Sequence, residues 1–238
     1  MTGLAAFLVA AIMLVPALFI AIPVHELGHA VTAYFLGDRS VRYFGYFDLS
    51  PGKLRRLFDP IGALAVLIAL VGWGRKVPVQ PNRISTMGQK VLFELGGPAA
   101  SLLAAVVFGV ILRFFIHNGA VPSATTPVGV LTFALYAIWF LNVSIFAFQL
   151  LPIPGLDGWD IVEALFKSRN PRFFFNVSTR RRQIWIGVIL VIFVGSIFRV
   201  PVLSVVMSPF YTAASLISFG QCTGYGVPNF NGLAPCLV

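Results

Sequence analysis

Long apolar runs separated by short polar stretches dominate the chain. A helix needs about 20 mostly apolar residues to cross a bilayer, and three runs are long enough: residues 4–36, 91–116 and 128–151. Two further apolar runs, at 184–198 and 202–219, are candidates for additional spans. The pattern predicts an all-α polytopic membrane protein with about five transmembrane helices.

A shorter apolar run at 60–74 calls for a different interpretation. At about 15 residues it is short for a crossing, and such a length is typical of a re-entrant or interfacial segment. We expect 60–74 to enter the membrane and return on the same side, lodged against protein that satisfies its backbone. Nearby, the alternation at 41–47 predicts a short strand or β-hairpin-like loop, and 76–81 is expected to be extended.

Basic residues gather in the loops 37–59, 75–90 and 155–182 and account for most of the net charge of +9. The positive-inside rule explains this distribution without a nucleic-acid partner, and it places all three loops in the cytoplasm. Loop 117–126 carries no formal charge and is expected outside. Loops 37–59 and 75–90 share one side only if 60–74 is re-entrant. Only 11% of residues are charged, against about 25% in soluble domains, so no soluble domain is expected.

A motif in the first run carries candidate chemistry. His25-Glu26-Leu27-Gly28-His29 matches H-E-x-x-H, which on a helix places both imidazoles on one face. They can share one zinc ion, and Glu26 can act as general base on a zinc-bound water. The alternative is a polar helix end with two unrelated histidines. Ionisable residues inside an apolar span are costly and usually functional, which favours the metal site.

A catalytic zinc site uses three protein ligands, and Asp157 is the candidate for the third. It lies in the segment Leu150–Gly158, where two prolines end the third long run before an Asp-Gly pair. Alternatively, Asp157 is the N-cap of a helix at 158–167, and one aspartate can serve both roles. If 60–74 is re-entrant, the 128–151 span runs from outside to inside and delivers Asp157 to the histidines.

These motifs, together with Gly72–Val79, Pro81 and Gly97–Ser101, resemble the site-2 protease family of intramembrane zinc metalloproteases, in its compact branch without a PDZ domain. The resemblance covers roughly residues 20–165. It implies a three-helix catalytic core built from the three long runs, one zinc ion per chain, Glu26 as catalytic residue, and a substrate that is another protein's transmembrane segment. The extended edge at 76–81, with Val77 and Val79, is expected to bind an unwound substrate strand by β-addition.

The chain departs from the family pattern at two positions. The family commonly has Asn eight residues before the liganding Asp, where it is thought to position the reacting group or stabilise the oxyanion; here Gln149 stands there. Gln149 carries the same amide and is expected to replace it in part, with Asn142, seven residues earlier, as a second candidate. Ser101 also stands where the family commonly has Asn.

The expected organisation is a catalytic membrane core at 1–182, followed by C-terminal helices and an irregular tail at 183–238. The compact form and the lack of a transit peptide point to a multi-pass protein of a prokaryotic plasma membrane. The alternative functions are a non-proteolytic membrane zinc-binding scaffold and a metal transporter. A transporter would usually show further intramembrane ligands along a path, and this chain has few. Cys222 and Cys236 both fall in the tail, where they could pair or stay reduced.

Overall fold

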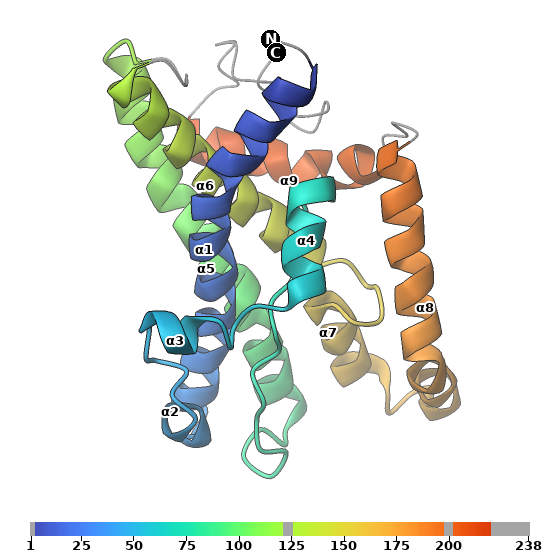
Figure 1. Ribbon diagram of the computed structural model, residues 1–238. Coiled ribbons are helices and arrows are strands. Elements are labelled where there is room, and N and C mark those ends of the chain that lie inside the picture. The colour runs from blue at the N-terminus through green and yellow to red at the C-terminus, as the bar shows by residue number, and fades with distance from the viewer. Residues whose placement is uncertain (1–2, 121–125, 198–201, 220–238) are drawn as a thin grey trace.

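The structure is a computed structural model that describes residues 3–120, 126–197 and 202–219. In these ranges the regular elements are helices, with isolated β-bridges but no strand. The helices, shown in Figure 1, are α1 (Gly3–Phe35), α2 (Ser40–Tyr43), α3 (Pro51–Leu54), α4 (Pro60–Ala69), α5 (Met87–His117), α6 (Pro127–Gln149), α7 (Asp157–Phe166), α8 (Pro171–Ile197) and α9 (Val202–Phe219).

Three of these helices are long and apolar enough to cross a membrane: α1 over Leu14–Phe35, α5 and α6. They pack against one another and correspond to the three long runs of the sequence. Of the five spans expected, these three are supported by length and composition among the described residues. α8 begins at Pro171, inside the basic stretch, and Arg180–Arg182 interrupt its apolar character. Cys222 and Cys236 lie outside the described residues.

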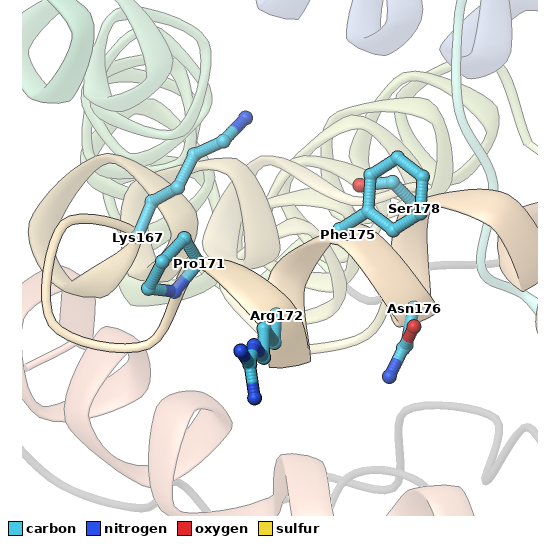
Figure 2. Close-up of a pocket in the computed structure, with 6 residues that line it drawn as sticks. All are labelled: Lys167, Pro171, Arg172, Phe175, Asn176 and Ser178. Carbon is cyan, nitrogen blue, oxygen red and sulfur yellow. The ribbon is translucent and has the colours of Figure 1, made fainter.

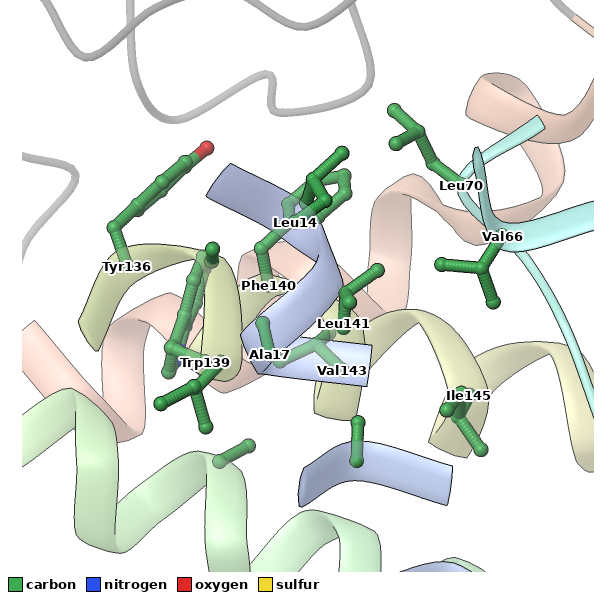
Figure 3. Packing of buried hydrophobic residues seen from close by; sticks show 14 of the residues in the cluster. Leu14, Ala17, Val66, Leu70, Tyr136, Trp139, Phe140, Leu141, Val143 and Ile145 are labelled. Atoms are coloured by element: carbon green, nitrogen blue, oxygen red, sulfur yellow. The ribbon is translucent and has the colours of Figure 1, made fainter. Parts of the chain in front are cut away.

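Helix α6 runs through the middle of the apolar core, and most of its residues are buried. Packing rather than water exclusion drives helix association in lipid, so side-chain fit decides how this core assembles. α9 covers one side of α6, where the Trp139 indole N–H donates to the Ser218 hydroxyl at 3.1 Å. Figure 3 shows the cluster, with the labelled residues Leu14, Ala17, Val66, Leu70, Tyr136, Trp139, Phe140, Leu141, Val143 and Ile145.

Helices α1 and α5 cross in backbone contact. A Cβ atom at Gly28 would overlap the Gly96 carbonyl oxygen and the Ala100 methyl group, and one at Gly96 would overlap Thr32. Small residues at a crossing let membrane helices approach closely. The crossing therefore holds the H-E-x-x-H turn of α1 directly against the Gly96–Ala100 turn of α5.

The segment around α4 packs against α1 and α8 and then returns to its starting point. Its ten helical residues reach about 15 Å, half of a hydrocarbon core. Asp59 caps its start by accepting the N–H groups of Ile61 and Gly62. Leu70 ends it in the left-handed conformation, at φ 59°.

The returning chain passes back along α4. A Cβ atom at Gly62 would overlap the Trp73 carbonyl, so the two backbones touch. Phe58 and Gly74 form an antiparallel bridge, and the Arg75 N–H donates to the Leu57 carbonyl at 2.8 Å. Both ends of 59–73 therefore lie side by side.

The strand or hairpin predicted at 41–47 is wrong. The chain there forms α2 and then turns, with Gly45 at φ 75°. Val41 is fully buried whereas Tyr43 is 89% exposed, so the alternation does not give one half-buried face. The strand expected at 76–81 does not form either. The chain at 75–80 is drawn out between α4 and the start of α5 (Figure 1), but it has no strand partner within the described ranges, and Pro81 begins a turn.

Candidate metal centre

His25, His29 and Asp157 converge although 128 residues separate His29 from Asp157. Asp157 Oδ2 lies 3.0 Å from His25 Nε2 and 3.0 Å from His29 Nε2, and the two nitrogens are 3.2 Å apart. All three side chains are buried. Burial raises the pKa of the Asp157 carboxyl, but the facing imidazoles of His29 and His25 lower it more, so the group is a carboxylate.

Helix α5 fixes how the two imidazoles are turned. His29 Nδ1 lies 2.9 Å from the Phe93 carbonyl oxygen, and His25 Nδ1 lies 3.1 Å from the Ser101 hydroxyl. Because a carbonyl can only accept, His29 Nδ1 carries a proton, and Nε2 is the nitrogen that can offer a lone pair to a metal when the ring is neutral. Partners of this kind set the tautomer and orientation of metal-binding histidines.

Gly97 provides the space in which the imidazoles lie. A Cβ atom there would overlap His29 Nε2 and crowd His25 Nε2. The Gly-Pro element of the sequence thus allows α5 to approach the ligand nitrogens themselves. No larger residue fits at position 97 without displacing them.

Glu26 lies beside the three ligands and lacks a partner. Its side chain is buried at 2% exposure, packed against Gly74, and Oε2 has no hydrogen bond among the described residues. An unpaired polar atom in such a place is costly. The orphaned oxygen indicates that water or a substrate atom belongs next to it.

The donor set fits zinc. Two imidazoles and one carboxylate, with a fourth position left for water, are typical of a catalytic zinc site. A tetrahedral ion with bonds of about 2.0–2.1 Å needs ligand atoms about 3.3 Å apart, close to the 3.0–3.2 Å separations seen here. Among the described residues, these three form the one group of His, Cys, Asp and Glu that could hold a metal ion.

A cation to which the sequence analysis gave no separate role lies next to this centre. Lys76 Nζ is 3.6 Å from Asp157 Oδ1 and 3.4 Å from Glu94 Oε2, and it also pairs with Asp160. Partial burial lowers the pKa of Lys76, but the carboxylates of Glu94, Asp157 and Asp160 raise it more, so it stays charged. Lys76 and Asp157 are 81 positions apart, which is why no local pattern could reveal the contact.

The other predicted site residues lie apart from the ligands. The Asn142 amide donates to the Ile138 carbonyl at 2.8 Å, and Gln149 is buried with its Oε1 unpaired. Neither forms a hydrogen bond with the three ligands in the described part of the chain. Leu156, not Asp157, is the N-cap of α7, so the capping alternative does not hold. Val77 is buried in the smaller hydrophobic cluster, and Val79 is half-buried against that cluster.

Two surface hollows flank this end of the molecule. One of about 570 Å³ lies between α5 and α7, and its lining includes Glu94 and Asp160, the partners of Lys76. Another of about 540 Å³ lies at the α7–α8 turn, where Figure 2 shows it lined by Lys167, Pro171, Arg172, Phe175, Asn176 and Ser178. Neither hollow is lined by His25, His29 or Asp157, so neither is the metal centre itself.

Comparison with known proteins gives relatives of one kind. The chain is 36% identical to YwhC of Bacillus subtilis over 155 residues, covering 64% of this chain and 68% of YwhC. It is 34% identical to Rip2 of Mycolicibacterium smegmatis over 151 residues and 28% identical to Rip2 of Mycobacterium tuberculosis over 165 residues. These matches cover 62% and 68% of this chain, and 55% and 60% of the two Rip2 proteins.

All three relatives bear the name "putative zinc metalloprotease". No family model matches the chain, and no solved structure matches it. The extent of the match to YwhC nevertheless shows the class, and the chain belongs to the site-2 protease family.

Proposed function

We propose that the protein is a zinc-dependent intramembrane endopeptidase, which hydrolyses peptide bonds in or near transmembrane segments of other membrane proteins. The observation that carries this proposal is the buried His25–His29–Asp157 centre with the unpaired carboxylate of Glu26 beside it. Both histidines lie within a candidate span. A peptide bond that reaches them would have to come from a chain in the membrane.

Metal binding and proton transfer would be carried out by different residues of the site. His25, His29 and Asp157 would hold one zinc ion per chain, which when bound supplies Lewis-acid chemistry and lowers the pKa of water. Glu26 would accept the proton of the attacking water and pass it to the departing amine nitrogen. Hydrolysis consumes water, which would enter from the hollow between α5 and α7, since two carboxylate partners of Lys76, Glu94 and Asp160, line that hollow.

The extended segment 75–80 would bind the substrate. None of the backbone hydrogen bonds among the described residues uses the N–H of Val77 or Val79, so this edge can add a strand by β-addition. Because the Val77 side chain is buried, it anchors the segment and leaves the backbone to the substrate. A photo-crosslinking residue at the exposed Pro78 should therefore capture substrate, and a failure to do so would contradict β-addition.

We further propose that 60–74 is re-entrant and that the metal centre faces the cytoplasm of a prokaryotic cell. The paired ends of 59–73 support the first point. The second rests on the gathering of the basic loops at one end of Figure 1, where α2, α3, the α4–α5 connection and the α7–α8 turn lie. A metal transporter would need several metal sites along a path. Among the described residues no second metal-binding group accompanies His25, His29 and Asp157, which favours the protease.

Metal analysis combined with a cleavage assay tests the proposal. We expect about one zinc per chain in the purified wild type, and far less after Asp157→Ala. Glu26→Gln should keep zinc but lose cleavage of a synthetic single-span protein whose apolar segment has a central Asn-Gly pair. A wild type that binds zinc without cutting this probe would point to the scaffold instead, and a wild type without zinc would contradict the metal centre.

A further inference from the structure

We propose that Lys76 is a positioning residue that sets which substrate bond is cut, by fixing the extended segment 75–80 relative to the metal centre. This inference rests on the proposed function and deepens it. Lys76 belongs to the segment that would pair with substrate, and its ammonium contacts a proposed metal ligand. One side chain thus joins the two parts whose relative position decides the register of cleavage.

Three tethers hold the extended segment. At its start, the Arg75 N–H donates to the Leu57 carbonyl. At its end, the Gln80 N–H donates to Asp38 Oδ2 at 2.7 Å. Both partners, Leu57 and Asp38, belong to the loops after α1. Neither tether reaches the element that carries the third ligand.

Lys76 supplies that missing connection. Asp157 and Asp160 are one turn apart on α7, and Glu94 faces them from α5; Lys76 contacts all three. Asp157 presents Oδ2 to the histidines and Oδ1 to Lys76. The ammonium therefore ties the segment to α7 at the liganding carboxylate itself. Arg181 of α8 also approaches Asp160, at 3.6 Å, but it does not touch the segment.

Strand pairing explains why this tether should govern the cleavage position. A paired strand regains its hydrogen-bond pattern and side-chain faces only when it slips by two residues, which moves each peptide bond by about 6.8 Å. If segment 75–80 shifts relative to the zinc ligands, a substrate strand paired two residues out of the main register can also place a peptide bond at the zinc ligands. Losing Lys76 should therefore spread cleavage to bonds two residues from the main site.

The expected effect on the metal is the opposite of that of a ligand mutation. Removing a positive charge near the site does not weaken its attraction for a divalent cation. Lys76→Met should therefore retain zinc, whereas Asp157→Ala should lose it. This difference separates a positioning role from a general loss of the site.

The first experiment maps the cut bonds of the synthetic single-span probe by mass spectrometry. With Lys76→Met we expect zinc content to be unchanged, kcat/KM to fall about 10- to 100-fold, and new cuts two residues from the main one. Lys76→Arg should restore the single cut. Lys53→Met is the matched control, because Lys53 has the same 44% side-chain exposure and also pairs with an aspartate, Asp48, away from the metal. Loss of zinc, or an unchanged cut pattern and rate, in Lys76→Met would overturn the inference.

The second experiment measures how the substrate strand is aligned with segment 75–80, without requiring cleavage. In the Glu26→Gln background, a photo-crosslinker at Pro78 should capture one position of the probe, and adding Lys76→Met should spread capture to positions two residues away. Capture at the same single position in both would overturn the role of Lys76 while leaving the proposed protease intact. A wild type that never cuts the probe would refute the proposed function, and the role of Lys76 with it.

Discussion

At the scale of single residues, the metal centre depends on groups that are not ligands. Ser101 and the Phe93 carbonyl turn the two imidazoles, Gly97 makes room for them, and Gly74 lies against Glu26. Three of these four groups come from α5. The histidines are therefore oriented by the neighbouring helix and not by α1 alone.

Ser101→Ala should weaken zinc binding while leaving the fold intact. The hydroxyl lies 3.1 Å from His25 Nδ1, and losing such a partner typically costs about 10- to 100-fold in metal affinity. Competition with a chelator would measure the change in zinc affinity. Ser208→Ala is a suitable control, since that hydroxyl bonds only to the Val205 carbonyl of its own helix. Equal affinities for the wild type and Ser101→Ala would show that Ser101 does not orient His25.

Gly74→Ala should lower kcat/KM about 100-fold without loss of zinc. The added methyl group would overlap the Glu26 side chain, and a displacement of about 1 Å at a reacting group can cost 100-fold in rate. The measurements are zinc content and kcat/KM on the single-span probe. Gly88→Ala, whose methyl group would meet nothing within 4 Å, should behave as wild type. Full activity of Gly74→Ala would argue against Glu26 as the base in this position.

The sequence could predict the residues of the candidate metal centre but not the groups that orient them. His25 and His29 share a helix face, and the break after the third long run singles out Asp157. Ser101 was visible only as a departure from the family pattern. Lys76 lies within the stretch Gly72–Val79, but its ion pairs could not be predicted, because its three carboxylate partners lie 18, 81 and 84 positions away.

At the scale of elements, long helices follow from the sequence and short ones do not. The runs at 4–36, 91–116 and 128–151 are within a few residues of α1, α5 and α6, since an apolar run of that length has few alternatives. The alternation at 41–47 gave a wrong prediction of a strand. Val41 is apolar because it is buried in the smaller hydrophobic cluster, not because it faces a strand partner. Periodicity over seven residues cannot separate these causes.

The α1–α4 loop and the extended segment are tied together by one carboxylate. Asp38 Oδ1 accepts the Ser40 N–H and hydroxyl, and Oδ2 accepts the Gln80 N–H. Burial raises the pKa of Asp38, but these hydrogen bonds and the charge of Arg83 lower it more, so the net pKa lies below the usual value.

This shift predicts how stability depends on pH. Because the folded pKa is depressed, the contribution of Asp38 is complete above the unfolded value of about 3.9 and is lost as pH falls through the folded value. Asp38→Asn should cost about 1.5–3 kcal/mol at pH 7, as for hydrogen bonds to a charged group, and the difference from wild type should shrink below pH 4. Thermal unfolding in detergent across this range would measure it. Asp48→Asn, at an exposed ion pair, is the control and should change little.

At the scale of the whole molecule, charge and structure divide the protein into two ends. The start of α1, the end of α5 and the start of α6 lie at one end of Figure 1; the basic loops and α7 lie at the other. Because the two ends of 59–73 are paired, the loops before and after α4 lie at the same end of the molecule. Helices α1, α5 and α6 then run alternately between the two ends. The end of α6 therefore lies near the H-E-x-x-H turn, as the contact of Asp157 with His25 requires.

Cysteine labelling in cells would test this arrangement directly. With Cys222 and Cys236 replaced by Ser, single cysteines at Lys53, Arg83 and Arg169 should be protected from an impermeant thiol reagent, whereas one at Asn118 should react. Positions 53 and 83 flank the α4 segment, so they decide its path. Labelling at 83 with protection at 53 would mean that 60–74 crosses the membrane. In that case α6 would run in the opposite direction and could not bring Asp157 to the histidines. The same result would therefore contradict the metal centre as well as the topology.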